Sequence, residues 1–384
     1  MGRLTTITPA DTQWSPTSID YAISGGYFTQ SISRGNYRKT LTLDGLLRPI
    51  LSHEWDNSNA AATSRYTVQR FNAYNKPLFS SYPSTSSTES QGTVYEYDGL
   101  QRPTRQYNTV DNTALEYAYL ANNQVRTTDA RGNSTTTSYR AFGSPSQTLP
   151  SKIEQPHGVT TDINYNIFDN VTTITQGGIT ESRIYNAQQR LCRLVRPDVG
   201  HTAYSYNTLG QPVWVAQGAS GGATACNEAS VTAAQKVSYS YDNLGAPRSI
   251  NYPDSTPDKT YTFDNQGNLT SLVAGTAVWD YSYNSAHLMD SEILTLNNIS
   301  WLIDPSYDAL GHVSSVTYPS GKSISYAPNA LGQPTQVGNY VTNASYYPSG
   351  QVKGYRYGNG LMFSQTLDNQ QRPEYQTVKR SNSN

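Results

Sequence analysis

The sequence has few charged residues. Asp, Glu, Lys and Arg make up only 14% of the 384 residues, against roughly 25% in ordinary globular proteins. The signs nearly cancel, since 27 Lys and Arg stand against 28 Asp and Glu. Binding to a nucleic acid or an anionic membrane surface needs a basic patch. The composition therefore disfavours polyanion binding, and we expect no nucleic-acid partner.

Cysteine and long apolar runs are scarce as well. The two cysteines, Cys192 and Cys226, are too few for a disulfide-rich scaffold. They are compatible with one bridge in an exported protein and also with two free thiols. No run of 18 apolar residues occurs, and the first residues lack the basic and apolar regions of a secretory signal. We expect a segment of a longer chain, without a membrane span or a signal peptide of its own.

Tyrosine, glycine and proline are abundant, with 31, 28 and 20 copies. Tyrosine favours strands, whereas glycine and proline mark turns. No segment shows a sustained apolar stripe at helical spacing, and the best helical candidate is the alanine-rich run 228–237. The composition predicts an all-β, turn-dense protein with very little helix.

A short motif recurs along the chain at a regular interval. It reads aromatic, any residue, aromatic, Asp or Asn, two spacers, often Gly, and then a polar residue. Clear copies are YEYDGLQRP (95–103), YSYNTLGQP (204–212), YSYDNLGAP (239–247), YTFDNQGNL (261–269) and PSYDALGHV (305–313). Between positions 166 and 329 the interval is 20 to 24 residues, except for one of 35 that contains a small-residue insertion at about 216–235. A fixed period of this kind indicates a repeat architecture.

The motif predicts a β-hairpin. Asp or Asn accepts hydrogen bonds from the backbone N–H groups that follow it, and Gly three residues later tolerates a positive φ. We assign turn closure to Asp98, Asp242, Gly245, Asp264, Gly267, Asp308 and Gly311. Aromatics at i and i+2 lie on one face of a strand, where they hold the register as a cross-strand ladder. We assign this ladder to Tyr95, Tyr97, Tyr239, Tyr241 and Tyr307.

The recurring Y-x-Y-D-x-x-G text resembles the YD repeat of the RHS (rearrangement hot spot) family, which includes the C component of insecticidal Tc toxins and the teneurins. The resemblance implies a long β-sheet strip wound in a spiral. Such a strip forms a hollow shell around a C-terminal polypeptide, often a toxin. The contexts of the two cysteines, QQRLCRL and GATACN, also resemble a pairing that recurs in bacterial members, which favours a Cys192–Cys226 bridge. A family-type Asp-Pro-x-Gly-Leu junction is not found, because Asp304-Pro305 opens a repeat.

On this basis we divide the chain into a lead-in β segment (1–36), a YD-repeat strip (37–375) and a tail (376–384). A β-propeller is the alternative fold, since two hairpins of about 20 residues approach the 40–45 residues or so of a WD40 blade. Adjacent repeats do not alternate in character, which favours the strip.

The sequence offers little support for catalysis. Residues 218–222 fit the G-x-S-x-G pattern, but a nucleophile elbow needs a strand before it and a helix after it, and this copy lies in the insertion. We expect a flexible loop there. The five histidines have no metal-ligand spacing, and the aspartates recur with the turns, whereas an active site is normally singular. We therefore expect no enzyme activity, no metal site and no cofactor.

The leading hypothesis is a structural segment of an RHS-type shell that encloses a C-terminal toxin. Its partners would be the rest of a longer RHS chain and the toxin cargo, and its location would be secreted, cell-surface or envelope. The alternative is a surface adhesin or carbohydrate-binding module, because rows of aromatic side chains can stack on sugars.

Overall fold

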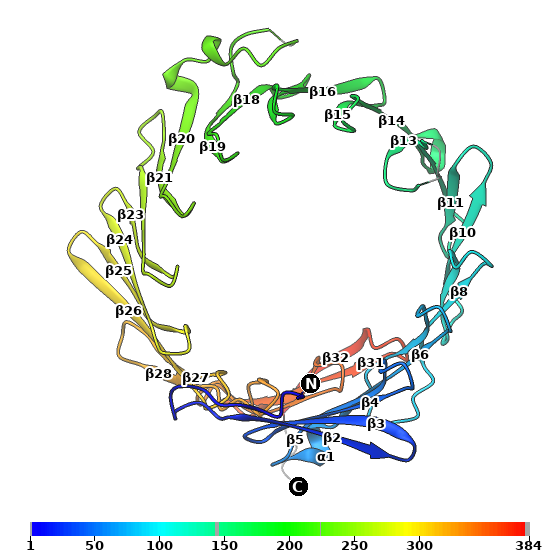
Figure 1. Cartoon of the computed structure of the whole chain (residues 1–384). Helices are drawn as coiled ribbons and strands as arrows, with labels where there is room; N and C mark the ends of the chain where they lie inside the picture. Colours follow the sequence, from blue (N-terminus) through cyan, green and yellow to red (C-terminus); the bar gives the residue numbers. More distant parts are fainter. Residues whose placement is uncertain (1, 143–145, 223, 381–384) are drawn as a thin grey trace. The chain divides into compact units, whose positions relative to one another are not determined.

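A computed structural model describes residues 2–142, 146–222 and 224–380 (Figure 1). Within these residues the helices are short. The α-helix α1 spans Ala60–Thr63, and the 3-10 turns η1, η2 and η3 span Pro156–Gly158, Glu228–Ser230 and Ala233–Gln235. The alanine-rich run 228–237 thus forms two 3-10 turns before a strand begins at Lys236. The last four residues of the predicted tail, 381–384, lie outside the described residues.

Strands occupy most of the described chain. The first half contains β1 (Thr6–Ile7), β2 (Thr17–Ser24), β3 (Tyr27–Arg34), β4 (Tyr37–Leu43), β5 (Pro49–Asp56), β6 (Arg65–Phe71), β7 (Pro77–Ser81), β8 (Gly92–Tyr97), β9 (Pro103–Asn108), β10 (Ala114–Leu120), β11 (Gln124–Thr128), β12 (Ser134–Tyr139), β13 (Pro150–Glu154), β14 (Thr160–Tyr165), β15 (Val171–Gln176) and β16 (Ile179–Tyr185). The second half contains β17 (Leu191–Arg196), β18 (Gly200–Tyr206), β19 (Pro212–Gln217), β20 (Lys236–Tyr241), β21 (Pro247–Asn251), β22 (Lys259–Phe263), β23 (Leu269–Ala274), β24 (Ala277–Tyr283), β25 (Met289–Leu296), β26 (Ile299–Tyr307), β27 (Val313–Thr317), β28 (Ser323–Ser325), β29 (Val341–Tyr346), β30 (Val352–Tyr357), β31 (Leu361–Leu367) and β32 (Pro373–Arg380).

The strands form a long antiparallel sheet. Strands β1–β28 belong to a 28-stranded sheet, and β29–β32 form a four-stranded one. Consecutive strands pair in chain order, as β14 does with β15, β15 with β16 and β16 with β17. The register shifts by one residue before each repeated turn, for example at Ser240/Tyr241, which marks a β-bulge. A continuous ladder of this kind is a strip and not a series of four-stranded blades, so the predicted all-β strip is confirmed and the propeller is not observed.

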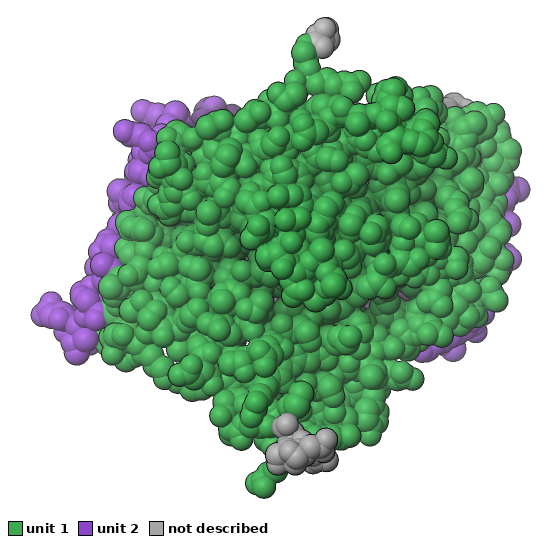
Figure 2. All heavy atoms as spheres, turned by 90° about the horizontal axis from the view of Figure 1, so that it is seen from below, with its two compact units in different colours: residues 1–114, 282–292, 301–384 green, residues 115–281, 293–300 purple. Residues whose placement is uncertain are grey.

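The chain divides into two compact units. Unit 1 comprises residues 1–114, 282–292 and 301–384, and unit 2 comprises residues 115–281 and 293–300 (Figure 2). Unit 1 thus combines strands from both ends of the sequence. Unit 2 contains a run of hairpins from β11 to β23 and the insertion after β19. The predicted boundaries of the strip, 37 and 375, stay predictions.

Few side chains are fully buried. A cluster of buried apolar residues lies in unit 2 beside the insertion and consists of Ala203, Ala216, Ala219 and Val231. Elsewhere most strand residues are half-buried, as expected for a sheet with little covering its faces. Hairpins of this size are marginal alone in water, so each repeat depends on its neighbours for stability.

Candidate functional site

The repeated hairpin turn is built in the same way in both units. After β20, Asp242 Oδ1 accepts hydrogen bonds from the backbone N–H groups of Leu244 and Ala246, both at 2.9 Å. The Gly245 N–H donates to the Asp242 carbonyl at 3.1 Å, which closes the turn. The same Oδ1 pattern is found at Asp98, Asp264 and Asp308. Each carboxylate therefore binds two backbone donors at the end of its hairpin.

The third residue after each turn Asp has a left-handed backbone. Gly245, Gly267 and Gly311 have φ values of 89°, 88° and 86°. At Gly245 there is a second constraint, because an added Cβ would lie 3.1 Å from Nε2 of Gln211 in the preceding turn. This Nε2 donates to the Gly245 carbonyl at 3.1 Å. Neighbouring turns are thus in direct contact.

Alanine substitution at two of these glycines separates backbone strain from the contact between turns. Gly267→Ala introduces only strain, since nothing lies within 4 Å of its added Cβ, and we expect a loss of about 1 kcal/mol in the free energy of unfolding. Gly245→Ala also displaces Gln211, and we expect a loss of about 2 kcal/mol. Urea unfolding of both variants measures the difference. Equal losses would show that the contact between turns contributes nothing.

The turn hydrogen bonds lower the pKa of three of these carboxyl groups, those of Asp98, Asp242 and Asp264. Bonds from the Ala246 backbone act first on Asp242, and bonds from the Arg102 backbone act first on Asp98. At Asp264 the largest cause is the Asn268 side chain. In each case the charged form is the better acceptor, so the folded protein favours it.

Acid is expected to destabilise the sheet through these carboxylates. Because their folded pKa values lie below the unfolded value of about 3.9, their stabilisation is complete above that pH and is lost as the pH falls through the folded pKa values. The urea concentration at the midpoint of unfolding should therefore decrease as the pH is lowered from 5 to about 2. Asp242→Asn provides the matched control, because Asn207 already accepts the equivalent bond from the Gln211 backbone at 3.0 Å. If Asp242→Asn leaves the pH dependence unchanged, this carboxylate is not one of its sources.

The second tyrosine of the motif bonds to the preceding hairpin. The Tyr97 hydroxyl donates to the Pro77 carbonyl at 2.9 Å, and the Tyr241 hydroxyl donates to the Pro212 carbonyl at 3.0 Å. In both cases the acceptor is the first residue of the return strand. The same type of bond is made by Tyr165, Tyr185, Tyr206 and Tyr307. We call this bond the tyrosine latch.

The first tyrosine of the motif has different surroundings. Tyr95 lies opposite Gln106 and Tyr239 opposite Ile250, so the partner across the hairpin is not aromatic. Both rings are half-buried. The ladder role of these tyrosines stays a prediction. The sequence did not indicate the latch, whose only signal is the frequent proline directly after the preceding turn.

Removing a latch hydroxyl should weaken the contact between hairpins. We expect Tyr241→Phe to lower the free energy of unfolding by about 1 kcal/mol, because it leaves the Pro212 carbonyl without this donor. Tyr239→Phe, two residues away on the same strand, should change it by less than about 0.5 kcal/mol. Urea unfolding and hydrogen exchange across β19 and β20 test the difference. Equal effects would show that ring packing, and not the latch, holds the hairpins together.

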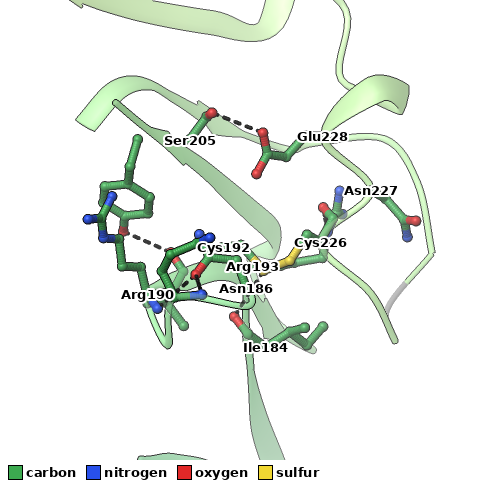
Figure 3. The surroundings of a disulfide bond; sticks show 12 residues. Ile184, Asn186, Arg190, Cys192, Arg193, Ser205, Cys226, Asn227 and Glu228 are labelled. Carbon is green, nitrogen blue, oxygen red and sulfur yellow. Dashed lines mark hydrogen bonds between the residues drawn. A yellow bond between two sulfur atoms is a disulfide. The ribbon is translucent and has the colours of Figure 1, made fainter. Parts of the chain in front are cut away.

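The insertion after β19 is anchored to the sheet of unit 2. Cys192 on β17 and Cys226 in the insertion form a disulfide bond, with their Cα atoms 5.2 Å apart (Figure 3). Close by, Ser205 on β18 donates to a carboxylate oxygen of Glu228 at 2.9 Å. The insertion is therefore tied to two neighbouring strands. We call residues 218–222 and 224–235 the cap.

Small side chains let the cap approach the sheet. Ala203 and Ala216 lie opposite each other on β18 and β19, and both are fully buried. Ala219 and Val231 of the cap pack onto them, beside the partly buried ring of Trp214. Larger residues at the two sheet positions would occupy the space of the cap.

The cap also covers a charged side chain. Arg193, next to the disulfide and opposite Ala203 in the register, has no exposed surface. Its guanidinium donates to the carbonyls of Cys226 at 3.0 Å and Ser220 at 3.1 Å, and it contacts His201 Nδ1 at 3.1 Å. Burial lowers the pKa of Arg193. Arginine nonetheless stays charged in proteins, so the cap holds a buried cation through its backbone carbonyls.

The serine of the G-x-S-x-G segment belongs to this cap. Ser220 Oγ donates to the Ser230 carbonyl, while the Ser220 carbonyl accepts from Arg193. His201 is bonded to Arg193 and not to this hydroxyl. In the described parts of the chain, no group of three or more His, Cys, Asp and Glu is placed to hold a metal ion. The segment is thus part of the anchoring of the cap.

Unit 1 has a cavity of about 560 Å³ with a mixed polar and apolar lining. Asp56, Asn59, Asp308 and Gln333 contribute to its lining. Asp56 is only 4% exposed, and its carboxylate accepts the Ala330 N–H at 2.7 Å. This bond joins the end of β5 to the turn at residues 329–333, far away in the sequence.

Comparison with known proteins supports the repeat and the fold. Residues 307–339 match the family model RHS Repeat, which confirms the resemblance. The solved structure of TcdB2-TccC3 without its hypervariable C-terminal region has a TM-score of 0.72 and 11% identity, over 95% of this chain and 21% of that one. A Photorhabdus luminescens Tc holotoxin pore has a TM-score of 0.70 and 12% identity, over 95% of this chain and 21% of that one. The TcdB2-TccC3 crystal structure has a TM-score of 0.70 and 12% identity, over 95% of this chain and 23% of that one. At such identities the likeness shows the fold.

The chain spans about a fifth of the length of these structures. A search of curated proteins gave no match. None of the helices in the described residues has the length and apolar character needed to cross a membrane.

Proposed function

We propose that this chain, with an RHS repeat at residues 307–339 and the fold of the TcdB2-TccC3 structures, is a non-enzymatic wall segment of an RHS-type shell that encloses a toxin polypeptide. The observation that carries the proposal is the repeated hairpin contact. Turn bonds close each hairpin, and latch bonds from Tyr97 to Tyr307 join a hairpin to the preceding one. Such a series of repeated bonds builds an extended sheet and does not gather functional side chains into one localised site.

The partners follow from the same proposal. They are the remainder of a longer RHS chain and its C-terminal toxin, because the solved structures with this fold come from Tc toxin complexes. We accordingly propose a secreted or surface-exposed location. The glycan-binding alternative has less support, since the hydroxyls of Tyr97, Tyr241 and Tyr307 are engaged with backbone carbonyls.

The mass of the native product tests the enclosure. Antibodies against this segment, with intact mass spectrometry of source cells and their medium, identify the chain that carries it. We expect a product much longer than 384 residues, with a separable C-terminal piece that resists added protease until the shell is unfolded. A native product of 384 residues with nothing attached would overturn the enclosure and favour an adhesive module.

A further inference from the structure

The repeated turns present apolar side chains at one edge of the strip. The second residue after the turn Asp or Asn is often large and apolar. Six such residues are between 60% and 95% exposed: Leu46, Tyr74, Leu100, Phe168, Leu209 and Leu244. Successive turns of this kind lie on one edge because two strands separate each from the next. We call this the turn edge, and we call the connections on the opposite side the loop edge.

At two later repeats, the equivalent leucines are covered by the chain itself. Leu310 and Leu331 are only half-exposed. Both line a cavity of about 220 Å³ together with Arg34 and Tyr37, at the loop edge between β3 and β4. Leu310 Cδ2 lies 3.2 Å from the position that a Cβ on Gly35 would take. Within unit 1, turn-edge leucines therefore pack against loop-edge residues.

A polar contact accompanies the apolar one at the residue directly after the turn Asp or Asn. The Ser15 N–H donates to the Ala309 carbonyl at 2.8 Å. The Ala330 N–H donates to buried Asp56 at 2.7 Å. At a third turn, Ser285 Oγ donates to Asp11 at 2.7 Å.

These three contacts have a common form. A turn of the late repeats meets a segment of residues 11–56, and the contact uses the first residue after the turn Asp or Asn. All three lie inside unit 1. The structure thus shows what covers a turn edge when it is covered: the loop edge of another part of the same kind of sheet.

We propose that the exposed turn edge of unit 2, formed by Phe168, Leu209 and Leu244, is a docking surface for the loop edge of a second copy of this chain. The loop edge of unit 2 has matching apolar residues, because Ile179 and Val199 are 62% and 66% exposed. A net charge of −1 sets up little repulsion between two such strips. This inference depends on the proposed wall function in one respect, because it expects another strip of the same fold beside this one.

Site-specific photocrosslinking of the full chain tests the docking. A benzophenone amino acid replaces Leu244, and equal amounts of ¹⁵N-labelled and unlabelled protein are mixed so that crosslinks between copies can be identified by mass. We expect crosslinks from position 244 to residues 177–179 or 197–200 of the other copy. The same probe at position 310 is the internal control, and it should crosslink to residues 15–35 of its own chain. Absence of crosslinks between copies at position 244, or crosslinks scattered over the sheet faces, would overturn the proposal.

Sedimentation of polar variants gives an independent measurement. The triple variant Phe168→Asn, Leu209→Asn, Leu244→Asn should have a self-association constant at least about tenfold lower than that of the wild type. Met362→Gln, which changes an exposed apolar residue away from these turns, should associate like the wild type. Equal weakening in both would show non-specific association and overturn the docking. Neither result alters the native mass, so the edge contact and the enclosure can fail separately.

Discussion

Replacing Arg193 by methionine is expected to lower the free energy of unfolding by about 3 kcal/mol or more. Methionine keeps much of the side-chain volume but has no donor for the carbonyls of Cys226 and Ser220 or for His201. Each buried acceptor left without a partner costs about 1–3 kcal/mol. The loss should be concentrated in β17, β18 and the cap, since these are the elements that Arg193 joins.

Urea unfolding and hydrogen exchange of unit 2 measure this effect. Arg196→Met is the matched control, because Arg196 is half-exposed and pairs with Glu181 at the surface. Exposed pairs contribute about 0–1 kcal/mol, so the control should lie close to the wild type. Arg193→Lys should recover only part of the loss, since an ammonium group cannot reproduce the planar fork. A loss below about 1 kcal/mol in Arg193→Met would refute the role given to these hydrogen bonds.

Breaking the disulfide should have a similar effect. The bond closes a segment with a sequence separation of 34 residues. A closed loop of that length restricts the unfolded chain by an amount equivalent to about 3–4 kcal/mol at 25 °C. We expect the double variant Cys192→Ala, Cys226→Ala to lose this stability and to exchange the amide hydrogens of the cap faster.

The disulfide prediction has two controls, the effect of reductant and the combination with the removal of Arg193. Reductant should destabilise the wild type and leave the double alanine variant unchanged. The combined effect of removing Arg193 and the disulfide should be smaller than the sum of the separate effects, because both fix the backbone at Cys226. Strict additivity would indicate that the two features stabilise separate parts of the cap.

Local chemistry explains how much could be predicted from the sequence. The turn at Asp242 depends on residues two, three and four positions later, all inside the visible motif. The strip fold follows from repeating that motif. The latch is different, because the carbonyl that Tyr241 reaches lies 29 residues earlier, and the proline at that position is its only signal in the sequence.

Arg193 could not be predicted for a different reason. A charged residue between two apolar ones on a strand is normally expected at the surface, since charged side chains are rarely buried. Its burial depends on a cap whose position is fixed by residues up to 33 positions away. The contact of Ser15 with Ala309 joins still more distant segments, and Ser15 lies outside every copy of the motif. The sequence therefore indicates the repeating hairpin, whereas contacts between segments that are distant in the sequence depend on three-dimensional packing.

The turn acceptor has a consequence for how such a protein can evolve. The oxygen that closes the turn is present in both aspartate and asparagine, as Asp242 and Asn186 show. Either residue preserves the hairpin, yet one adds a negative charge at neutral pH and the other adds none. Mutation at this codon can thus alter the electrostatic field along an edge of the sheet, repeat by repeat, while the fold is conserved. The surface potential can diverge between relatives in this way while the sheet stays the same.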